Sequence, residues 1–307
     1  MRTAFVRPLT ELAEKDSRVN LITGDLGFGV LEDFARRFPK QYLNSGVAEQ
    51  NMAGLATGMA LCGKTVFTYS IGNFPTLRCL EQVRNDICYH NANVKIVCVG
   101  GGFAYGSLGI SHHATEDLAI LRSLPNMTVL APGDPVEAAA ATRACAERPG
   151  PFYLRLGKAG EPTVHAGPID FQIGRALRMR EGTDLCLIST GGMLAVAAEV
   201  ADVLAKSSIR ARLLSMHTVK PLDVEAVLAA GREVPLIVTL EEHSILGGLG
   251  GAVAEILAEA KSPRAVLKRI GIPGTFTSEV GGQDHLRKFY GLSPDKVLSS
   301  IREWLNP

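Results

Sequence analysis

The sequence has no excess of charge of either sign and no long apolar run. Its 307 residues include 32 Lys and Arg against 31 Asp and Glu, and the formal net charge is +1. The charges are interspersed, so no basic stripe or acidic tail indicates nucleic acid or a membrane as partner. No apolar run reaches the roughly 18 residues that a membrane span requires, and no signal-peptide pattern is present. We therefore expect a cytoplasmic protein.

The cysteines lack the paired spacing of a disulfide framework or a zinc site. They are Cys62, Cys79, Cys88, Cys98, Cys145 and Cys186. Scattered cysteines in apolar or helical contexts are typical of reduced core thiols. The glycine-rich stretches also lack the G-x-G-x-x-G and Gly-Lys-Ser/Thr phosphate-binding patterns. A stand-alone dinucleotide-binding protein is therefore a poor alternative.

Strand and helix signals alternate in both halves of the chain. Strands are predicted at 19–23, 41–44, 65–69, 94–99, 127–130, 152–156, 185–189, 211–216, 236–240 and 265–270. Helices are predicted at 3–15, 31–38, 49–62, 76–90, 116–123, 135–147, 195–205, 224–230 and 252–260, followed by two terminal helices. The Gly- and Pro-rich segment 157–173 is interpreted as a linker. We therefore predict two doubly wound α/β domains with parallel sheets, at residues 1–164 and 165–307.

Glu49 begins a helix of small, apolar residues directly after a predicted strand. The composition of the helix predicts that it is buried. A carboxylate at a helix N-terminus is favoured by the macrodipole, and ligands collect at the carboxyl edge of parallel sheets. A first-turn Glu that only helps to cap a core helix is the structural alternative.

Two further segments follow strands at the same predicted edge. Phe74 falls in a turn after Gly72, where an aromatic ring could carry a flat heterocycle or merely cover the end of the sheet. The long glycine-rich loop 100–113 ends in His112 and His113. Adjacent histidines alone are weak evidence for a metal site, so we interpret them as hydrogen-bond partners for an oxygen-rich substrate.

These segments together resemble a known family. The run Gly-Val-Ala-Glu-Gln-Asn-Met at 46–52, the aromatic strand end from Tyr69 to Phe74, the loop closing on Ser111-His112, and Leu-Ala-Pro-Gly-Asp at 130–134 occur in that order. They resemble the pyrimidine-binding domain of thiamine-diphosphate enzymes of the transketolase branch. Val-Lys-Pro-Leu-Asp at 219–223 and Glu-Glu-His-Ser-Ile-Leu-Gly-Gly at 241–248 resemble the transketolase C-terminal domain.

The resemblance implies a role for each matching residue. The acid at position 49 would be the catalytic group that hydrogen-bonds the cofactor's aminopyrimidine and favours its reactive tautomer. Phe74 would stack on that ring, and Tyr69 would line the same pocket. His112, with His113 beside it, would bind a substrate hydroxyl. Arg2 and Lys158 match positions where the family binds the anionic end of a sugar.

The resemblance also implies a partner. Full-length transketolases carry a preceding domain that holds the diphosphate and Mg²⁺ through a Gly-Asp-Gly motif, and this chain has Gly24-Asp25-Leu26 instead. It therefore resembles the C-terminal subunit of a split transketolase. Thiamine diphosphate would be shared with an N-terminal subunit carrying the Mg²⁺ ligands, as a two-plus-two heterotetramer.

Two departures from the family concern the substrate. Leu108 stands where relatives place an aspartate four residues before the histidine, and segment 100–106 has no counterpart of their phosphate-binding histidine. The expected reaction is transfer of a two-carbon ketol unit from an anionic ketose to an aldose, with the particular sugars open.

Three alternatives remain. One is the β subunit of a 2-oxoacid dehydrogenase, which a pyruvate assay with a dye acceptor would reveal. Half of an enzyme like 1-deoxyxylulose-phosphate synthase is the second. A non-catalytic subunit that has kept the fold is the third, because fold alone does not imply activity.

Overall fold

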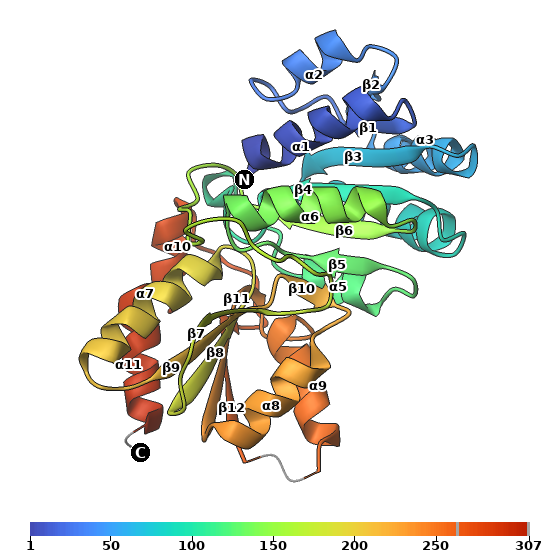
Figure 1. Ribbon diagram of the computed structural model, residues 1–307. Helices are drawn as coiled ribbons and strands as arrows, with labels where there is room; N and C mark the ends of the chain where they lie inside the picture. Colours follow the sequence, from blue (N-terminus) through green and yellow to red (C-terminus); the bar gives the residue numbers. More distant parts are fainter. Residues whose placement is uncertain (262–263, 306–307) are drawn as a thin grey trace.

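The computed structural model describes residues 1–261 and 264–305. The chain forms two α/β units, one after the other in sequence (Figure 1). The first unit is coloured blue to green and the second yellow to red. The first half contains α1 (Arg2–Lys15), β1 (Val19–Thr23), α2 (Glu32–Arg37), β2 (Tyr42–Asn44), α3 (Glu49–Leu61), β3 (Thr65–Ile71), η1 (Leu77–Cys79), α4 (Leu80–Gln82), η2 (Val83–Cys88), β4 (Val94–Val99), η3 (Gly106–Leu108), η4 (Ile110–His112), α5 (Asp117–Ser123), β5 (Thr128–Leu130), α6 (Pro135–Glu147) and β6 (Phe152–Leu156).

The second half contains β7 (Leu177–Arg180), β8 (Leu185–Ser189), α7 (Met193–Lys206), β9 (Ala211–Ser215), β10 (Thr218–Lys220), α8 (Val224–Glu233), β11 (Leu236–Ser244), α9 (Leu249–Glu259), β12 (Val266–Ile272), α10 (Gln283–Phe289) and α11 (Pro294–Leu305). The predicted fold class, two α/β units built on largely parallel sheets, is confirmed. In the described part of the chain, no helix is long and apolar enough to cross a membrane.

The first sheet has seven strands in the order β10-β5-β6-β4-β3-β1-β2. Neighbouring strands from β5 to β2 are parallel, whereas β10 pairs antiparallel with β5. The prediction of a purely parallel sheet was therefore wrong at this edge. β10 lies beyond the predicted boundary at 164/165, so one strand of the second half completes the sheet of the first. The boundary itself stays a prediction.

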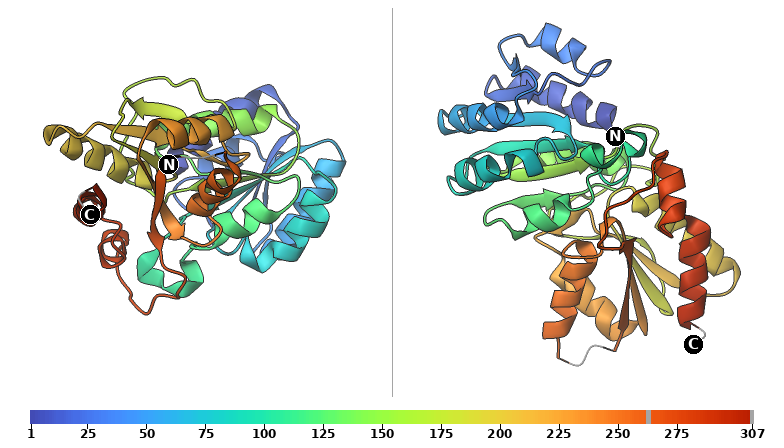
Figure 2. Two further views of the ribbon diagram at one scale, coloured as in Figure 1. Left: turned by 90° about the horizontal axis from the view of Figure 1, so that it is seen from below. Right: turned by 180° about the vertical axis from the view of Figure 1, so that it is seen from behind.

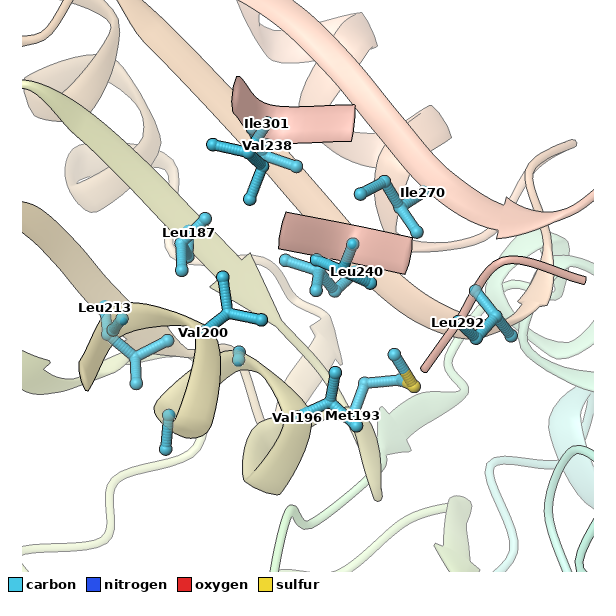
Figure 3. Packing of buried hydrophobic residues seen from close by; sticks show 14 of the residues in the cluster. Leu187, Met193, Val196, Val200, Leu213, Val238, Leu240, Ile270, Leu292 and Ile301 are labelled. Carbon is cyan, nitrogen blue, oxygen red and sulfur yellow. The ribbon is translucent and has the colours of Figure 1, made fainter. Parts of the chain in front are cut away.

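The second sheet has five strands in the order β12-β11-β8-β9-β7. Its edge strand β7, which the sequence did not reveal, runs antiparallel to β9. Helices α7 and α11 cover one face and α8 and α9 the other, as the two views of Figure 2 show. Figure 3 shows the first of these cores, where Val196 and Val200 of α7 and Ile301 of α11 pack on sheet residues such as Leu187 and Leu240.

Two local predictions need correction. The helix predicted at 76–90 is a succession of 3-10, α and π turns that begins at Leu77 and ends at Cys88. Helix α3 was predicted to be buried, but only its inner side is. Glu49, Met52, Ala53, Ala56 and Thr57 are buried, while Gly54, Leu55, Gly58 and Leu61 are exposed.

A buried ion pair joins the two halves of the chain. Asp117 of α5 accepts hydrogen bonds from Arg155 Nε at 2.8 Å and from the Tyr153 hydroxyl at 2.5 Å. Arg155 Nη2 also donates to the carbonyl of Ala114 at 2.7 Å and to that of Glu242, on β11, at 3.0 Å. A buried pair of this kind costs most when only one partner is removed, because the other charge remains uncompensated.

We expect Asp117→Asn to lower the free energy of unfolding by about 3–5 kcal/mol, because Arg155 would keep its charge without a counter-ion. Urea unfolding measures the effect as a shift in midpoint at constant slope. The matched control is Asp33→Asn, whose exposed pair with Arg36 should contribute less than about 1 kcal/mol. Equal losses in the two variants would contradict this account.

The linker covers a buried histidine. His217 is fully buried and stacks on Phe171 of the linker with ring centroids 4.0 Å apart. Burial lowers the pKa of His217 from 6.5 to about 4, and the neighbouring His165 acts in the same direction. The charges of Glu137 and Asp223 act in the opposite direction. Between these two values the unfolded chain binds a proton that the folded chain does not.

Stability should therefore fall by about 3 kcal/mol as the pH drops from 6.5 to 4, through this group alone. His217→Gln removes the titrating group, so the variant should lose less stability than the parent over that range, even if its stability at pH 7 is lower. Chemical unfolding at a series of pH values gives both slopes. Parallel slopes would show that His217 does not titrate as described.

Candidate active site

The site lies at the edge of the first sheet where parallel strands end. β1, β3 and β4 are adjacent in this sheet, and β2 pairs with β1, so the segments that follow them meet at one edge. Such carboxyl edges are where open α/β sheets bind ligands.

Glu49 is the buried acid of this edge. It is the first residue of α3 and its side chain is only 2% exposed. One carboxylate oxygen, Oε2, accepts a hydrogen bond from Arg78 Nη1 at 3.0 Å, and the other, Oε1, accepts one from Ser70 Oγ at 3.4 Å. Gly24, at the end of β1, leaves room for this side chain, since a Cβ there would lie 3.3 Å from Glu49 Cγ.

A buried thiol lies close to this carboxylate. Burial, reinforced by the charge of Glu49, raises the pKa of Cys79 to about 12. Cys79 therefore remains protonated near neutral pH and donates its Sγ–H to the carbonyl of Phe74 at 3.1 Å. It supports the turn and has no nucleophilic character.

Phe74 lies in the predicted turn after β3, beside Glu49's partner Arg78. The guanidinium carbon of Arg78 lies over the Phe74 ring, 4.7 Å from its centroid. The His112 ring meets Phe74 edge-on at 5.1 Å. Gly72 permits this approach, because it has a φ of +42° and a Cβ there would lie 3.2 Å from the His112 carbonyl.

The glycine-rich loop brings His112 and Tyr105 to the same place. The Tyr105 ring packs against Gly100, where the φ is +87° and a Cβ would lie 2.2 Å from the ring. The centroids of Tyr105 and His112 are 6.2 Å apart. Burial, together with the neighbouring His113, lowers the pKa of His112, so its imidazole is neutral at pH 7 and can both donate and accept.

The two predicted cations lie together although 156 positions separate them in sequence. Arg2 Nε donates to the Lys158 carbonyl at 2.7 Å. Lys158 Nζ lies 4.8 Å from the centroid of the Tyr105 ring, which connects the pair to the loop that carries His112. The structure thus joins Arg2, Lys158 and His112 through Tyr105.

Of the other predicted residues, Tyr69 meets this group at Arg2, whereas His113 is not brought into it. Tyr69 is 1% exposed and its ring stacks on Phe5 of α1 at 5.9 Å. Burial raises the pKa of Tyr69 well above its ordinary value, opposed by the nearby Arg2 guanidinium. His113 is also 1% exposed, with Nε2 3.1 Å from the Gly106 carbonyl. His113 therefore faces the interior, where its ring meets Phe103, while the His112 ring meets Phe74.

Sequence reasoning missed Arg78, Tyr105 and Ser70. Arg78 stands four residues after Phe74 and carries the one charge in the segment 64–80 after Lys64. This spacing was the signal that could have indicated Arg78 as a site residue. The direction of its side chain, however, depends on the turn after β3.

A cavity of about 510 Å³ lies between the two halves of the chain, apart from these residues. It is lined in part by Arg155, Glu242 and Arg287. These three charges have partners, since Arg287 Nε donates to Glu242 Oε2 at 2.8 Å and Arg155 binds Asp117. We interpret this cavity as part of the contact between the two halves of the chain.

Comparison with protein-family models assigns both halves of the chain. Residues 1–161 match the transketolase pyrimidine-binding domain, and residues 174–297 match the transketolase C-terminal domain. The fold and the site therefore define a chain composed of the last two domains of a transketolase.

The chain is similar to transketolase subunits and to a split-gene transketolase. A subunit of the apulose-4-phosphate transketolase of Phocaeicola vulgatus is 38% identical over 307 residues, covering 99% of this chain and 97% of that protein. The 6-deoxy-6-sulfo-D-fructose transketolase subunit of Clostridium sp. strain MSTE9 is 36% identical, with coverage of 99% and 94%. A solved split-gene transketolase, described as an inactive β4 tetramer, is 37% identical with a TM-score of 0.89 and covers 99% and 97%.

The chain belongs to the transketolase family. Over almost its whole length it corresponds to the C-terminal subunit of split transketolases, as the sequence resemblance implied, and the predicted transferase class is confirmed.

Proposed function

We propose that this chain contributes Glu49 and Phe74 to a thiamine-diphosphate site shared with an N-terminal subunit, and Arg2, Lys158 and His112 to binding an anionic ketose. The complex transfers a two-carbon ketol unit from that ketose to an aldose. The observation that carries the proposal is the pairing of a buried carboxylate with an aromatic ring face at one sheet edge.

The residues present fit the aminopyrimidine of the cofactor. Glu49 and Phe74 already hold one planar, N–H-bearing group between them, the Arg78 guanidinium. A pyrimidine ring has the same requirements, a nitrogen facing the carboxyl group and a face on the aromatic ring. When bound, thiamine diphosphate supplies the carbon nucleophile and the electron sink of the reaction.

Glu49 is suited to hold a proton at a ring nitrogen. Its carboxyl group is shielded from water and fixed by the start of α3, so a hydrogen bond to it is stronger than in solvent. Phe74 fixes the plane of the ring, and stacking of aromatic rings adds about 1 kcal/mol beyond area burial. Ser70 and Gly24 determine where the carboxyl group lies, and neither takes part in proton transfer.

The substrate residues favour an anionic sugar. Lys158 and Arg2 place two positive charges beside Tyr105, and a lysine binds phosphate as a point charge. His112, neutral at pH 7, can donate to or accept from a sugar hydroxyl. The names of the similar proteins point the same way, since apulose 4-phosphate and 6-deoxy-6-sulfo-D-fructose are both anionic.

The surface around Glu49 favours a partner subunit. Val47, before α3, is 73% exposed, and Leu55 and Leu61 on the outer face of α3 are 38% and 60% exposed. Gly54 and Gly58 on that face have open space where a Cβ would be. Exposed apolar side chains gathered on and beside one helix favour a protein interface there. We propose that the diphosphate-binding subunit covers it and brings the Mg²⁺ ligands, in a two-plus-two heterotetramer.

Glu49→Gln tests the catalytic role. The variant should assemble with the N-terminal subunit but lose about 10²–10⁴-fold in ketol transfer, because the amide cannot exchange a proton with the ring. Native mass measurement checks assembly, and a coupled ketose–aldose assay checks the rate.

Glu81→Gln, an exposed charge change on α4, is the matched control and should keep the parental rate. Unchanged turnover by Glu49→Gln would overturn the assignment. Turnover of pyruvate with a dye acceptor, and none with sugars, would instead favour a 2-oxoacid dehydrogenase subunit.

Arg2→Ala and Lys158→Ala test the anion site. Each should raise the KM for a phosphorylated or sulfonated ketose about tenfold or more, because a charge-assisted hydrogen bond contributes about 1.5–3 kcal/mol. The KM for an uncharged ketose should change little, and Lys15→Ala, an exposed change on α1, should affect neither. Equal losses on charged and uncharged ketoses would show that these residues do not select the anion.

A further inference from the structure

Arg78 makes both of the contacts that the proposed function reserves for the cofactor ring. Its Nη1 lies 3.0 Å from Glu49 Oε2, and its Cζ lies 4.7 Å from the Phe74 ring centroid. The two contacts come from one guanidinium, so the group lies between the acid and the aromatic face. Its side chain is 47% exposed, whereas that of Glu49 is 2% exposed. Arg78 therefore closes the solvent side of a buried carboxylate.

The chemistry of a guanidinium explains why the Arg78 side chain fits between Glu49 and Phe74. The group is planar and delocalised, stacks on aromatic faces and presents N–H donors in its own plane. An aminopyrimidine ring offers a plane of the same kind with a nitrogen at its edge. The Phe74 face beneath Arg78 and the space in front of Glu49 Oε2 cannot hold both groups at once. The Phe74 ring also meets the His112 ring, in a T-shaped contact with centroids 5.1 Å apart.

We propose that Arg78 is an internal competitor of the cofactor, which occupies the pyrimidine position in the free subunit and must swing out when thiamine diphosphate enters. The inference rests on the proposed function and adds to it a residue that sets cofactor affinity. Until the cofactor arrives, Arg78 compensates the buried charge of Glu49. Afterwards the ring takes over the hydrogen bond to the carboxyl group.

The surroundings of Arg78 allow this movement. It lies in η1, a turn of three residues that follows the Gly72–Thr76 turn, and its neighbour Leu77 is 38% exposed. Glu49 is the carboxylate with which Arg78 forms an ion pair in the described part of the chain. Leaving the site therefore breaks one ion pair and one stacking contact. The incoming ring replaces the hydrogen bond to the Glu49 carboxyl group and the contact with the Phe74 face.

The direct test is cofactor affinity in the reconstituted complex. Equilibrium dialysis with thiamine diphosphate and Mg²⁺ should give a Kd about tenfold lower for Arg78→Ala than for the parent, because the competitor is gone. Arg78→Lys, which keeps the charge but not the plane, should lie between them. The matched control is Arg84→Ala, an exposed arginine on η2 that contacts neither Glu49 nor Phe74, and its Kd should equal that of the parent.

A second measurement needs no cofactor. In the isolated subunit, Arg78→Ala should raise the unfolding equilibrium constant about tenfold, yet change it less than twofold when Glu49→Gln is already present. Such non-additivity reports that the two side chains are in contact in solution.

The outcomes separate cleanly. A tighter Kd for Arg78→Ala together with non-additive stability supports the inference. An unchanged Kd would mean that Arg78 does not compete, and a weaker one would make it a ligand of the cofactor; either result overturns the inference and leaves the proposed function standing. If the parental complex binds no thiamine diphosphate, the proposed function fails and the inference with it.

Discussion

The position of the site loop depends on Arg155, a buried cation held from both halves of the chain. Its Nε binds Asp117, and its Nη2 binds the carbonyls of Ala114 and Glu242. Ala114 closes the glycine-rich loop through its bridge to Gly102, and Glu242 Oε1 accepts from the Phe103 amide at 2.7 Å. The loop that carries Tyr105 and His112 is therefore fastened to β11 of the second sheet. Contacts in the second half thus fix the position of residues at the carboxyl edge of the first sheet.

Much of the architecture could be predicted because it is encoded locally. The alternation of apolar runs and small-residue helices gave both α/β units, and α6 begins at Pro135 as predicted because Asp134 caps it, accepting from the Glu137 amide at 2.9 Å. Glu49 and Phe74 could be placed at the sheet edge for the same reason, since each lies in the segment that follows a strand end. Strands β7 and β10 could not be found, because each is short and is held by pairing with a distant strand.

The rest of the site depends on side-chain directions that spacing does not determine. Arg2 and Lys158 meet only because α1 and the end of β6 lie at the same sheet edge. His112 and His113 are identical in sequence terms, yet the short turn η4 sends one outward and the other against Phe103. Arg78 looks like a surface charge until the turn after β3 folds it back onto Phe74. These side-chain directions depend on tertiary contacts, which a single sequence does not reveal.

Strand β10 gives the chain an unusual dependence between its halves. Thr218 and Lys220 hydrogen-bond to β5 as the outermost strand of the first sheet. A fragment that stopped in the linker would leave β5 as a bare edge with unpaired backbone groups, open to pairing with other chains. The first sheet therefore gains its outermost strand only after synthesis has passed residue 220.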